Sequence, residues 1–346
     1  MVIHIVGARP QFIKLAPIVK AFRDIDISFK VIHTGQHYDY NMSDLHFKTL
    51  GLVEPEYNLD IGSSSHAKQT ARMLEDIEDV LNKEKPCLVM VYGDTNSTLS
   101  GALCAAKLNI PIAHVEAGVR SFDMHMPEEI NRLLTDRVST FHFCPTDNAV
   151  GLLKKEGING IFTGDVMYDA LLDISIPDTS NTYPHPFILT TIHRAENTDN
   201  IDRFTEIWNG LKLLSKDIRI IFPAHPRTRN MYKDILSRND HTITITDPVS
   251  YLEMISMIKD ASCMITDSGG VQKEAFLLKT PCITVRDTTE WPETIDAGAN
   301  CLVPTDANRI YLKTKDMTNA MINLEKNPFG DGKASHHIAK FIKDRF

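Results

Sequence analysis

The chain lacks several features that would each define a class of protein. No apolar run in its 346 residues approaches the roughly 18 residues that a membrane-spanning helix needs, so no membrane span is expected. Basic residues are also in deficit, because 37 Lys and Arg stand against 45 Asp and Glu and give a net charge of −8. Nucleic acids and anionic membranes require a basic surface, so neither is an expected partner.

Cysteine is scarce and shows no metal-binding pattern. The six cysteines form no C-x-x-C pair, so the thiolate set of a zinc site is missing. Most of them lie inside or beside strand patterns, which favours core thiols in a reducing cytosol. His33 and His37 stand four apart, but Gly35 between them favours a loop over the helix that such ligands need. We therefore expect a cytoplasmic protein without a metal site.

Two common nucleotide-binding fingerprints are absent as well. No G-x-G-x-x-G follows a strand pattern, and GDGKAS lacks the glycine five positions before Gly332 that a P-loop requires. A tightly bound dinucleotide is therefore not expected, and no cofactor is predicted. The first apolar run, Val2–Val6, has no basic residue before it, so it is interpreted as a strand and not as a secretion signal.

What the chain does contain is a regular alternation of short apolar runs with longer amphipathic segments. Strand patterns lie at Val2–Val6, Phe29–His33, Leu88–Val91, Ile112–Val115, Phe141–Cys144, Phe187–Thr191, Ile218–Phe222, Thr242–Ile245, Cys263–Thr266 and Cys282–Val285. Helical patterns lie at Lys14–Phe22, Gln69–Leu81, Thr95–Lys107, Pro127–Ser139, Ile201–Leu214, Tyr251–Ile258, Val271–Leu278 and Asn308–Leu324. This alternation predicts βαβ units, and hence parallel sheets with helices on both faces.

We predict an α/β fold made of two doubly wound, Rossmann-like domains that face each other across a cleft. The polar, proline-bearing stretch Ile176–Pro186 divides the chain into two similar halves. Residues 1–175 are expected to form the N-terminal domain, and residues 176–329 the C-terminal domain. The helical pattern at 330–346 could dock on the N-terminal domain.

Three carboxylates lie where such a fold places catalytic groups. Asp94 follows one strand pattern, Glu116 ends the next, and Glu128 opens a helical pattern. Ligands bind at the carboxyl ends of parallel strands, and a carboxylate is costly to bury there unless it is paired or used. We interpret the three as an acid/base cluster, against the alternative of helix caps and salt bridges.

The segment Thr266–Glu274 follows a strand pattern and opens a helical one. Gly269 and Gly270 after Ser268 let a ligand approach the backbone, and the free N–H groups of a helix N-terminus attract an anion such as a diphosphate. Glu274, one turn into the helix, could reach a neutral hydroxyl such as that of a ribose. The alternative is a glycine turn without a ligand.

Cationic and imidazole side chains follow strand patterns in both halves. Arg9 and Lys14 lie at the start of the first helix, where they can clamp a phosphate, although surface cations are common. His193 lies just past a strand end in LTTIHRAEN, a position suited to an acid, a base or a phosphate donor, and equally to a structural histidine. His225 is similarly placed, beside Arg227, and is the weaker candidate.

Taken together, these motifs resemble the non-hydrolysing UDP-N-acetylglucosamine 2-epimerases. The matching blocks span nearly the whole chain in order and include GARPQFIKLAP, VYGDTNSTLSGALCAAKLNIPIAHVEAGVRS, MPEEINRLLTD, HRAENTDN, TDSGGVQKEAF and NPFGDGKAS. The resemblance implies a GT-B fold, a homodimer and no metal. It also implies reversible conversion of UDP-N-acetylglucosamine (UDP-GlcNAc) to UDP-N-acetylmannosamine (UDP-ManNAc), which feeds surface polysaccharide synthesis.

The resemblance also implies roles for the candidate residues. Asp94, Glu116 and Glu128 match the family's catalytic carboxylates, and His193 matches its catalytic-site histidine. The positions that hold the UDP moiety are matched by Arg9, Lys14, Met254, Ser268, Gly269, Gly270 and Glu274, with Met254 at the uracil pocket.

Several residues depart from the family's sequence pattern, so the resemblance does not determine which UDP-sugar is the substrate. Gln11 replaces a carboxylate, and Trp291 replaces a frequent arginine that contacts the nucleotide. Gln36 and His37 persist where bacterial members bind a second substrate molecule as an activator, but their surroundings differ. GARPQFIK and TEW also resemble the branch that epimerises UDP-2,3-diacetamido-2,3-dideoxy-glucuronate.

The chemistry of C2 inversion narrows the mechanism. The hydrogen at C2 has no neighbouring carbonyl to acidify it, and transient oxidation at C3 would need NAD, for which the fingerprint is absent. The other route expels UDP by anti elimination, leaves a 2-acetamidoglucal and reprotonates C2 on the opposite face. Which of the three carboxylates removes the proton stays open.

Three other classes share some of these motifs. A GT-B glycosyltransferase would use the same fold and anion site but would need an acceptor, because fold does not fix function. A hydrolysing epimerase would release free UDP, and a non-catalytic nucleotide-sugar sensor would not need the carboxylates. Incubation with UDP-GlcNAc alone separates these alternatives.

Overall fold

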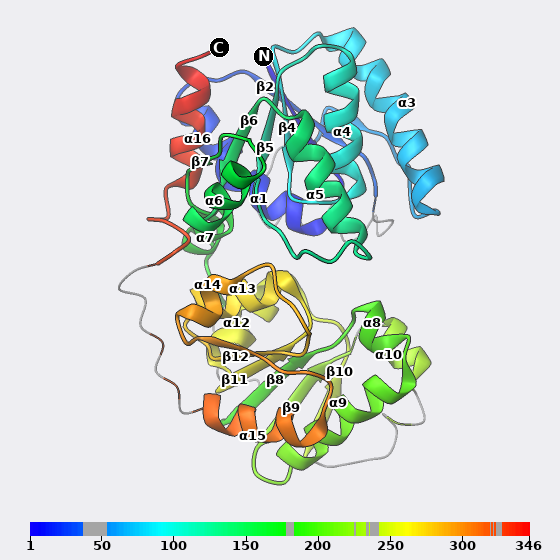
Figure 1. The fold of residues 1–346 in the computed structure, drawn as a ribbon, viewed down its shortest axis with the longest axis vertical. Helices are drawn as coiled ribbons and strands as arrows, with labels where there is room; N and C mark the ends of the chain where they lie inside the picture. The colour runs from blue at the N-terminus through cyan, green and yellow to red at the C-terminus, as the bar shows by residue number, and fades with distance from the viewer. Residues whose placement is uncertain are drawn as a thin grey trace. The chain divides into compact units, whose positions relative to one another are not determined.

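The computed structural model describes residues 1–36, 54–177, 183–224, 226–232, 235, 242–318, 320, 322 and 327–346. The chain divides into two compact units (Figure 1). Unit 1 consists of Met1–Ile174 together with Asn327–Phe346, and unit 2 consists of Ser175–Lys326. Both ends of the chain therefore belong to unit 1.

Unit 1 is built on a seven-stranded parallel sheet with the order β3-β2-β1-β4-β5-β6-β7. Its strands are β1 (Val2–Val6), β2 (Phe29–His33), β3 (Tyr57–Asn58), β4 (Leu88–Tyr92), β5 (Ile112–Val115), β6 (Phe141–Cys144) and β7 (Ile161–Phe162). Its helices are α1 (Arg9–Asp24), α3 (His66–Glu84), α4 (Asn96–Lys107), α5 (Pro127–Val138), α6 (Asp147–Lys155), α7 (Val166–Asp173) and α16 (Ala334–Lys343).

Helices cover both faces of this sheet, as Figure 1 shows. Strand β1 is buried along its whole length, and its side chains alternate between the two faces. Val2 and Val6 join the core formed with α1 and α16, whereas Ile3 and Ile5 join the core formed with α3 and α4. Because both faces are covered, the strand is apolar apart from His4, which is what made it recognisable in the sequence.

The C-terminal helix α16 is held on unit 1 by a buried carboxylate. Asp169 of α7 accepts hydrogen bonds from the N–H groups of Ala334 (3.1 Å) and Ser335 (2.7 Å) and from the Ser335 hydroxyl (2.6 Å). These contacts satisfy the free donors at the start of α16, and Ile338 and Ile342 then pack into the core beside α1.

Unit 2 repeats the doubly wound plan with a six-stranded parallel sheet in the order β10-β9-β8-β11-β12-β13. Its strands are β8 (Phe187–Thr191), β9 (Arg219–Pro223), β10 (Ile243–Thr246), β11 (Cys263–Thr266), β12 (Cys282–Thr284) and β13 (Asn300–Leu302). Its helices are α8 (Ala195–Thr198), α9 (Ile201–Leu214), α10 (Pro226–Met231), α12 (Tyr251–Asp260), α13 (Gly269–Leu277), α14 (Pro292–Asp296) and α15 (Ala307–Met317). In both units the chain reverses its winding direction beside the first strand, as in Rossmann folds.

The α/β fold of two doubly wound sheets is confirmed, but one helix is shorter than its pattern indicates. The pattern Asn308–Leu324 predicts a helix to Leu324, whereas α15 ends at Met317, and the described residues after it are not helical. The sequence also missed the strands β3, β7 and β13, which have only two or three residues each. Runs this short carry no readable periodicity.

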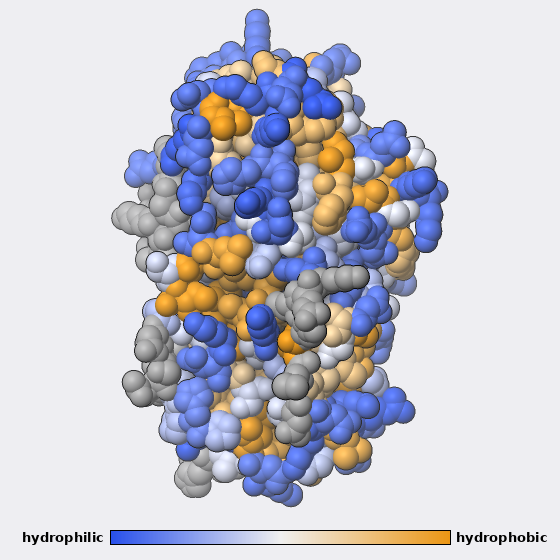
Figure 2. All heavy atoms as spheres, turned by 90° about the vertical axis from the view of Figure 1, so that its left-hand side faces the viewer, coloured by the Kyte–Doolittle hydropathy of each residue, from blue (hydrophilic) through white to orange (hydrophobic). Residues whose placement is uncertain are grey.

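Several expected absences can be examined in the described part of the chain. No helix there is both long enough and apolar enough to cross a bilayer. The described ranges also contain no group of three or more His, Cys, Asp or Glu side chains placed to hold a metal ion. All six cysteines are free thiols, buried or half-buried. Hydrophilic side chains predominate on the face drawn in Figure 2, with smaller apolar patches between them.

One buried histidine should make the stability of the protein depend on pH. His4 of β1 is fully buried between aromatic rings, with Nδ1 2.6 Å from the Tyr92 hydroxyl. Burial lowers the pKa of His4 to about 3, below its usual 6.5. As pH falls from 6.5 towards 3, the unfolded chain binds a proton that the folded protein excludes. Stability should therefore fall by up to about 1.4 kcal/mol per pH unit from this residue.

Urea unfolding at pH 8, 7, 6 and 5 checks this prediction. The variant His4→Phe should show a shallower loss of unfolding free energy between pH 6.5 and pH 5 than the wild type. His125→Ala, which removes a fully exposed histidine, is the matched control and should keep the wild-type slope. Equal slopes in wild type and His4→Phe would contradict the assignment.

Candidate active site

Asp94 and Glu116 lie at the carboxyl ends of adjacent strands, because β4 pairs in parallel with β5. Glu116 directly follows β5 and has a φ of 72°, a left-handed conformation that is uncommon for a residue with a β-carbon. The N–H groups of Glu116 and Ala117 both donate to the Phe143 carbonyl at 3.0 Å, which holds the turn in place. Backbone strain of this kind concentrates at functional sites, so it supports an active role for Glu116.

A buried cation is bound to Glu116. The Lys14 ammonium, from α1, lies 2.6 Å from Glu116 Oε1, and both side chains are less than a tenth exposed. The pair lies against the backbone of Gly93, where an added β-carbon would come 3.0 Å from Lys14 Nζ. Gly93 also has a φ of 61°, so glycine suits this position for two reasons. Lys14, which the resemblance assigned to UDP, is thus an ion-pair partner of a catalytic candidate.

A second cation is bound to Asp94. Nη2 of Arg132, from α5, lies 2.6 Å from Asp94 Oδ2, and Asn131 of the same helix donates to the Asp94 carbonyl at 2.9 Å. Helix α5 therefore holds both the side chain and the main chain of Asp94. Sequence reasoning missed Arg132 and Asn131. The spacing of Glu129 and Arg132, three apart on one helix face, was the available signal.

The two adjacent acids at the start of α5 have different environments. Glu129 is buried and accepts hydrogen bonds from the N–H of Ser121 (2.9 Å), the N–H of Phe122 (3.0 Å) and Arg132 (3.0 Å). Glu128 is exposed in the first helical turn. Successive residues of a helix point about 100° apart, so burial of one acid leaves its neighbour accessible. Of the two, Glu128 is the acid that can meet a substrate.

The start of α1 is organised by Gln11, the residue that departs from the family's carboxylate. Its Oε1 accepts from the N–H groups of Gly7 (2.8 Å) and Ala8 (2.9 Å), as a carboxylate could. Its Nε2 donates to the Tyr92 carbonyl at 2.9 Å, which a carboxylate could not do. The amide therefore suits this position. Arg9, two residues earlier, is half-buried and is the first residue of the helix.

In unit 2, a buried carboxylate holds the loop that carries His193. Asp267 directly follows β11, is fully buried, and accepts from the N–H groups of His193 (3.1 Å) and Arg194 (3.0 Å) and from Asn197 (3.1 Å). The His193 ring lies with Nδ1 3.4 Å from Asp267 and remains 44% exposed. Asp267 therefore orients the imidazole from one side, and the other side of the ring is accessible to a ligand. Sequence reasoning noted Asp267 only as part of a motif.

The residues after Asp267 form the expected turn into a helix. Ser268 is the N-cap of α13, with its hydroxyl accepting from the Val271 N–H at 3.4 Å. The following Gly269 is buried, and an added β-carbon would lie 3.2 Å from the carboxylate of Glu290. Gly270 is exposed. The N–H groups at the start of a helix can meet an anion, and the anion site at this turn stays a prediction.

Two further candidates lie on helices of unit 2 that pack together. Glu274 is one turn into α13 and largely buried, and Met254 is half-buried in the first turns of α12. Helix α12 packs beside α13. The structure therefore keeps Ser268, Glu274 and Met254 in one region of unit 2, on neighbouring helices.

Beneath the Gly269 turn, unit 2 contains buried charges that sequence reasoning missed. Glu290 is bound by Arg286 at 2.6 Å and faces Arg194 at 3.4 Å. The adjacent Trp291, in place of the family's arginine, has the Lys273 ammonium 4.1 Å from its ring centre. Such cation–π contacts stabilise a buried ammonium. The tryptophan thus has a packing role in this chain.

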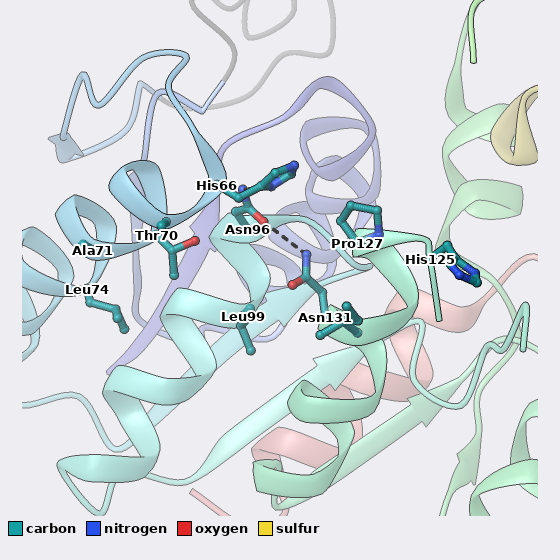
Figure 3. A pocket seen from close by; sticks show the side chains of 11 residues that line it. His66, Thr70, Ala71, Leu74, Asn96, Leu99, His125, Pro127 and Asn131 are labelled. Atoms are coloured by element: carbon teal, nitrogen blue, oxygen red, sulfur yellow. Dashed lines mark hydrogen bonds between the residues drawn. The ribbon is translucent and has the colours of Figure 1, made fainter. Parts of the chain in front are cut away.

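A cavity of 520 Å³ lies in unit 1 between α3, α4 and α5 (Figure 3). Figure 3 shows Asn131 pointing towards Asn96, and the two are joined by a hydrogen bond of 3.3 Å. The lining is His66, Ala67, Thr70, Ala71, Leu74, Asn96, Leu99, His125, Pro127, Ile130 and Asn131. It includes no Lys or Arg, so this cavity is unsuited to a diphosphate.

The residues predicted from the sequence therefore form one group in unit 1 and another group in unit 2. In unit 1, Lys14 and Glu116 are in direct contact, and Asp94 lies at the adjacent strand end. In unit 2, His193 and Ser268 flank the strand end occupied by Asp267. His37 and His225 lie outside the described residues.

Two doubly wound sheets that carry these strand-end groups define a GT-B-type α/β enzyme. A family model described as UDP-N-acetylglucosamine 2-epimerase matches residues 20–343. The chain therefore belongs to the UDP-N-acetylglucosamine 2-epimerase family, a family of isomerases.

Individual relatives are similar over nearly their whole length. The UDP-N-acetylglucosamine 2-epimerase of Methanocaldococcus jannaschii is 45% identical over 98% of this chain and 97% of that protein. The UDP-2,3-diacetamido-2,3-dideoxy-D-glucuronate 2-epimerase of Pseudomonas aeruginosa is 46% identical over 99% of each chain. The solved structure of the M. jannaschii enzyme in complex with UDP-GlcNAc and UDP has a TM-score of 0.91, with 44% identity over 99% of this chain and 98% of that one.

Proposed function

We propose that the protein interconverts UDP-GlcNAc and UDP-ManNAc by inverting the configuration at C2 of the sugar. The observation that carries this proposal is the pair of cation-bound carboxylates at neighbouring strand ends. Glu116 lies 2.6 Å from Lys14, and Asp94 lies 2.6 Å from Arg132. Membership of the epimerase family, and the likeness to a structure solved with UDP-GlcNAc and UDP, support the same assignment.

The proposed reaction proceeds by elimination and re-addition of UDP. The C1–O bond to UDP breaks, a carboxylate takes the C2 proton, and the electrons of the C2–H bond form the C1=C2 double bond of 2-acetamidoglucal. A proton is then delivered to the other face of C2, and the UDP oxygen adds back to C1. Two carboxylates on opposite sides of the ring can divide these proton transfers, as paired acids do in glycoside cleavage.

We assign the proton transfers to Asp94, Glu116 and Glu128. Lys14 and Arg132 fix the orientation of two of these acids and balance their charge, which pre-organises the site before substrate arrives. Glu128 is exposed at the start of α5 and is therefore accessible to the sugar. We assign Lys14 to this network and not to the phosphates.

We assign the UDP moiety to the residues that match the family's nucleotide-binding positions. The N–H groups around Ser268, Gly269 and Gly270 suit a diphosphate, and the open side of the His193 ring can donate to it. The remaining proposed contacts are Arg9 with the phosphates, Glu274 with the ribose and Met254 with the uracil. Binding energy from UDP, which does not change covalently at its base or ribose, can then be used to hold the sugar at the carboxylates.

UDP-2,3-diacetamido-2,3-dideoxy-glucuronate is the second candidate substrate. It is favoured by the 46% identity to the P. aeruginosa enzyme that bears its name, which is as high as the 45% identity to the M. jannaschii UDP-GlcNAc enzyme. Both sugars carry an acetamido group at C2, so the same carboxylates would serve either. Parallel assays with the two UDP-sugars decide between them.

Proton NMR in deuterated water tests the proposed reaction. The enzyme, incubated with UDP-GlcNAc alone and a chelator, should produce UDP-ManNAc that carries deuterium at C2, because the removed proton exchanges with solvent. No acceptor, NAD or divalent metal should be needed.

Each other outcome has a distinct meaning. Product without deuterium at C2 would contradict the elimination route, and net release of free UDP and sugar would indicate a hydrolysing enzyme. If the enzyme converts only UDP-2,3-diacetamido-2,3-dideoxy-glucuronate, that sugar is the substrate and the elimination mechanism is unchanged. Strict metal dependence would overturn the proposal.

A further inference from the structure

One buried carboxylate in unit 1 contacts the turn that carries Glu116 directly and the turn that carries Asp94 through His114. Asp136 lies near the end of α5, eight residues after Glu128, and its side chain is fully buried against β5. It is the last residue of the MPEEINRLLTD block, but no role was predicted for it. Its position is notable because the same helix binds Asp94 through Arg132, one turn before Asp136.

The two oxygens of Asp136 have different partners. Oδ1 lies 2.6 Å from Nδ1 of His114, which is in β5. Oδ2 accepts from the N–H of Gly118 at 3.1 Å and lies 2.7 Å from the Arg120 guanidinium. Arg120 is bound in turn by Glu156, with two contacts of 2.9 Å. The carboxylate is therefore the centre of a buried chain of charges.

The His114 ring has an acceptor at each nitrogen. Nδ1 faces Asp136, and Nε2 lies 2.7 Å from the carbonyl oxygen of Gly93. A neutral imidazole carries one N–H, so one of these short contacts would then join two acceptors. Protonation of both nitrogens satisfies both contacts and places a positive ring beside an ionised carboxylate.

The surrounding charges support an ionised Asp136. Burial acts to raise the pKa of Asp136, but His114 and Arg120, by charge and hydrogen bonding, outweigh it, and the pKa lies below its usual value. The group that faces His114 from β6 is His142, whose Nε2 lies 2.7 Å from the Asp136 carbonyl. Burial lowers the pKa of His142, so it adds no competing positive charge at neutral pH.

Both contacts lead to catalytic turns. Gly93, held through His114, directly precedes Asp94. Gly118, held by Asp136 itself, is two residues after Glu116, whose left-handed backbone needs a fixed turn around it. We propose that Asp136 is a positioning residue that, through a doubly protonated His114 and the Gly118 amide, fixes the Asp94 turn relative to the Glu116 turn.

The charge state and the positioning can be tested independently of turnover. In 15N-histidine NMR of the full-length protein at pH 7.5, one of the 14 histidines should show both ring nitrogens protonated, and this signal should be missing in His114→Gln. In hydrogen exchange, Asp136→Asn should speed exchange in the segments around Gly93 and Gly118, with the rest of unit 1 unchanged. His114→Gln should affect only the Gly93 segment.

Turnover tests the consequence, and this arm rests on the proposed function. Asp136→Asn should lower kcat on the order of 10- to 100-fold with KM changed by no more than about 3-fold, since misplacement of catalytic groups acts on the transition state. Glu156→Gln, which removes the outer charge of the same chain, is the control and should keep kcat within about 2-fold.

The proposal is overturned if His114 is neutral in the wild type, if exchange around Gly118 is unchanged in Asp136→Asn, or if that variant keeps wild-type kcat. Should Asp136→Asn fail to fold, the wild-type spectrum and the exchange and kcat of His114→Gln decide. A wild type that converts neither UDP-sugar would refute the proposed function. The NMR and exchange measurements do not depend on turnover, so they would still test the positioning role of Asp136.

Discussion

Asp94→Asn, Glu116→Gln and Glu128→Gln should each lower kcat for epimerisation by about two orders of magnitude or more, which is what general acid–base groups contribute. Each change preserves shape and removes the ability to take up and return a proton. The amide oxygens can still accept from Lys14 and Arg132, so folding should be retained. Steady-state kinetics with UDP-GlcNAc, together with thermal unfolding of each variant, provides the measurement.

Glu129→Gln is the matched comparison for Glu128→Gln. It makes the same change one residue along the same helix, but Glu129 is buried and accepts from Ser121, Phe122 and Arg132. We expect it to lower the unfolding free energy by about 1–3 kcal/mol, because a buried acceptor site loses strength and an amide N–H₂ faces donors. Glu128→Gln should leave stability unchanged, since the side chain is exposed.

Kinetics near the wild-type level in all three catalytic variants would refute the acid/base assignment. A loss in Asp94→Asn and Glu116→Gln alone would instead restrict the proton transfers to the two strand-end acids. Solvent deuterium incorporation into unreacted UDP-GlcNAc refines this, because a variant that lacks only the returning acid can still remove the C2 proton.

Glu274→Ala should weaken UDP binding on the order of 10-fold or more, whereas His193→Ala should lower kcat by roughly 10- to 100-fold and weaken UDP binding much less. A ribose contact persists through the reaction, so its loss appears in ground-state binding. In the proposed site the imidazole donates to the diphosphate, where charge grows as the C1–O bond breaks, so its loss should appear mainly in turnover. Calorimetry with UDP and steady-state kinetics separate the two effects.

The chain offers a matched control for the histidine. His185 precedes the amino end of β8 and His193 follows its carboxyl end, and both side chains are exposed. His185→Ala should therefore change neither kcat nor UDP affinity. Unchanged UDP affinity in Glu274→Ala would place the nucleotide elsewhere than at α13.

Helices and strands could be predicted from the sequence where burial gives the apolar residues a regular pattern. Strand β1 is buried throughout and apolar apart from His4, and β8 and β11 are likewise fully buried and mostly apolar. Helix α9 was found with its bounds because its apolar stripe repeats over several turns. The pattern at Asn308–Leu324 failed at its end, because amphipathic spacing continues past Met317 in the sequence while the helix does not.

The sequence by itself determined the doubly wound α/β plan, the strand-end acids Asp94 and Glu116, and the glycine turn before α13. These follow from local spacing, two residues for strands and three or four for helices, which any stretch of chain displays. It did not determine their partners. Lys14 is 102 residues from Glu116 and Arg132 is 38 from Asp94, and each meets its partner only because α1 and α5 dock on the sheet in a particular register.

Helix packing also decides which acid of α5 is exposed and which side chains Asp136 contacts. Which of Glu128 and Glu129 is buried depends on how the helix is rotated against its neighbours, and no local pattern states that angle. The contact of Asp136 with His114 likewise requires α5 to pack on β5. Residue types and their period are properties of the chain, whereas the pairing of buried charges is a property of packing, and only the tertiary structure decided it.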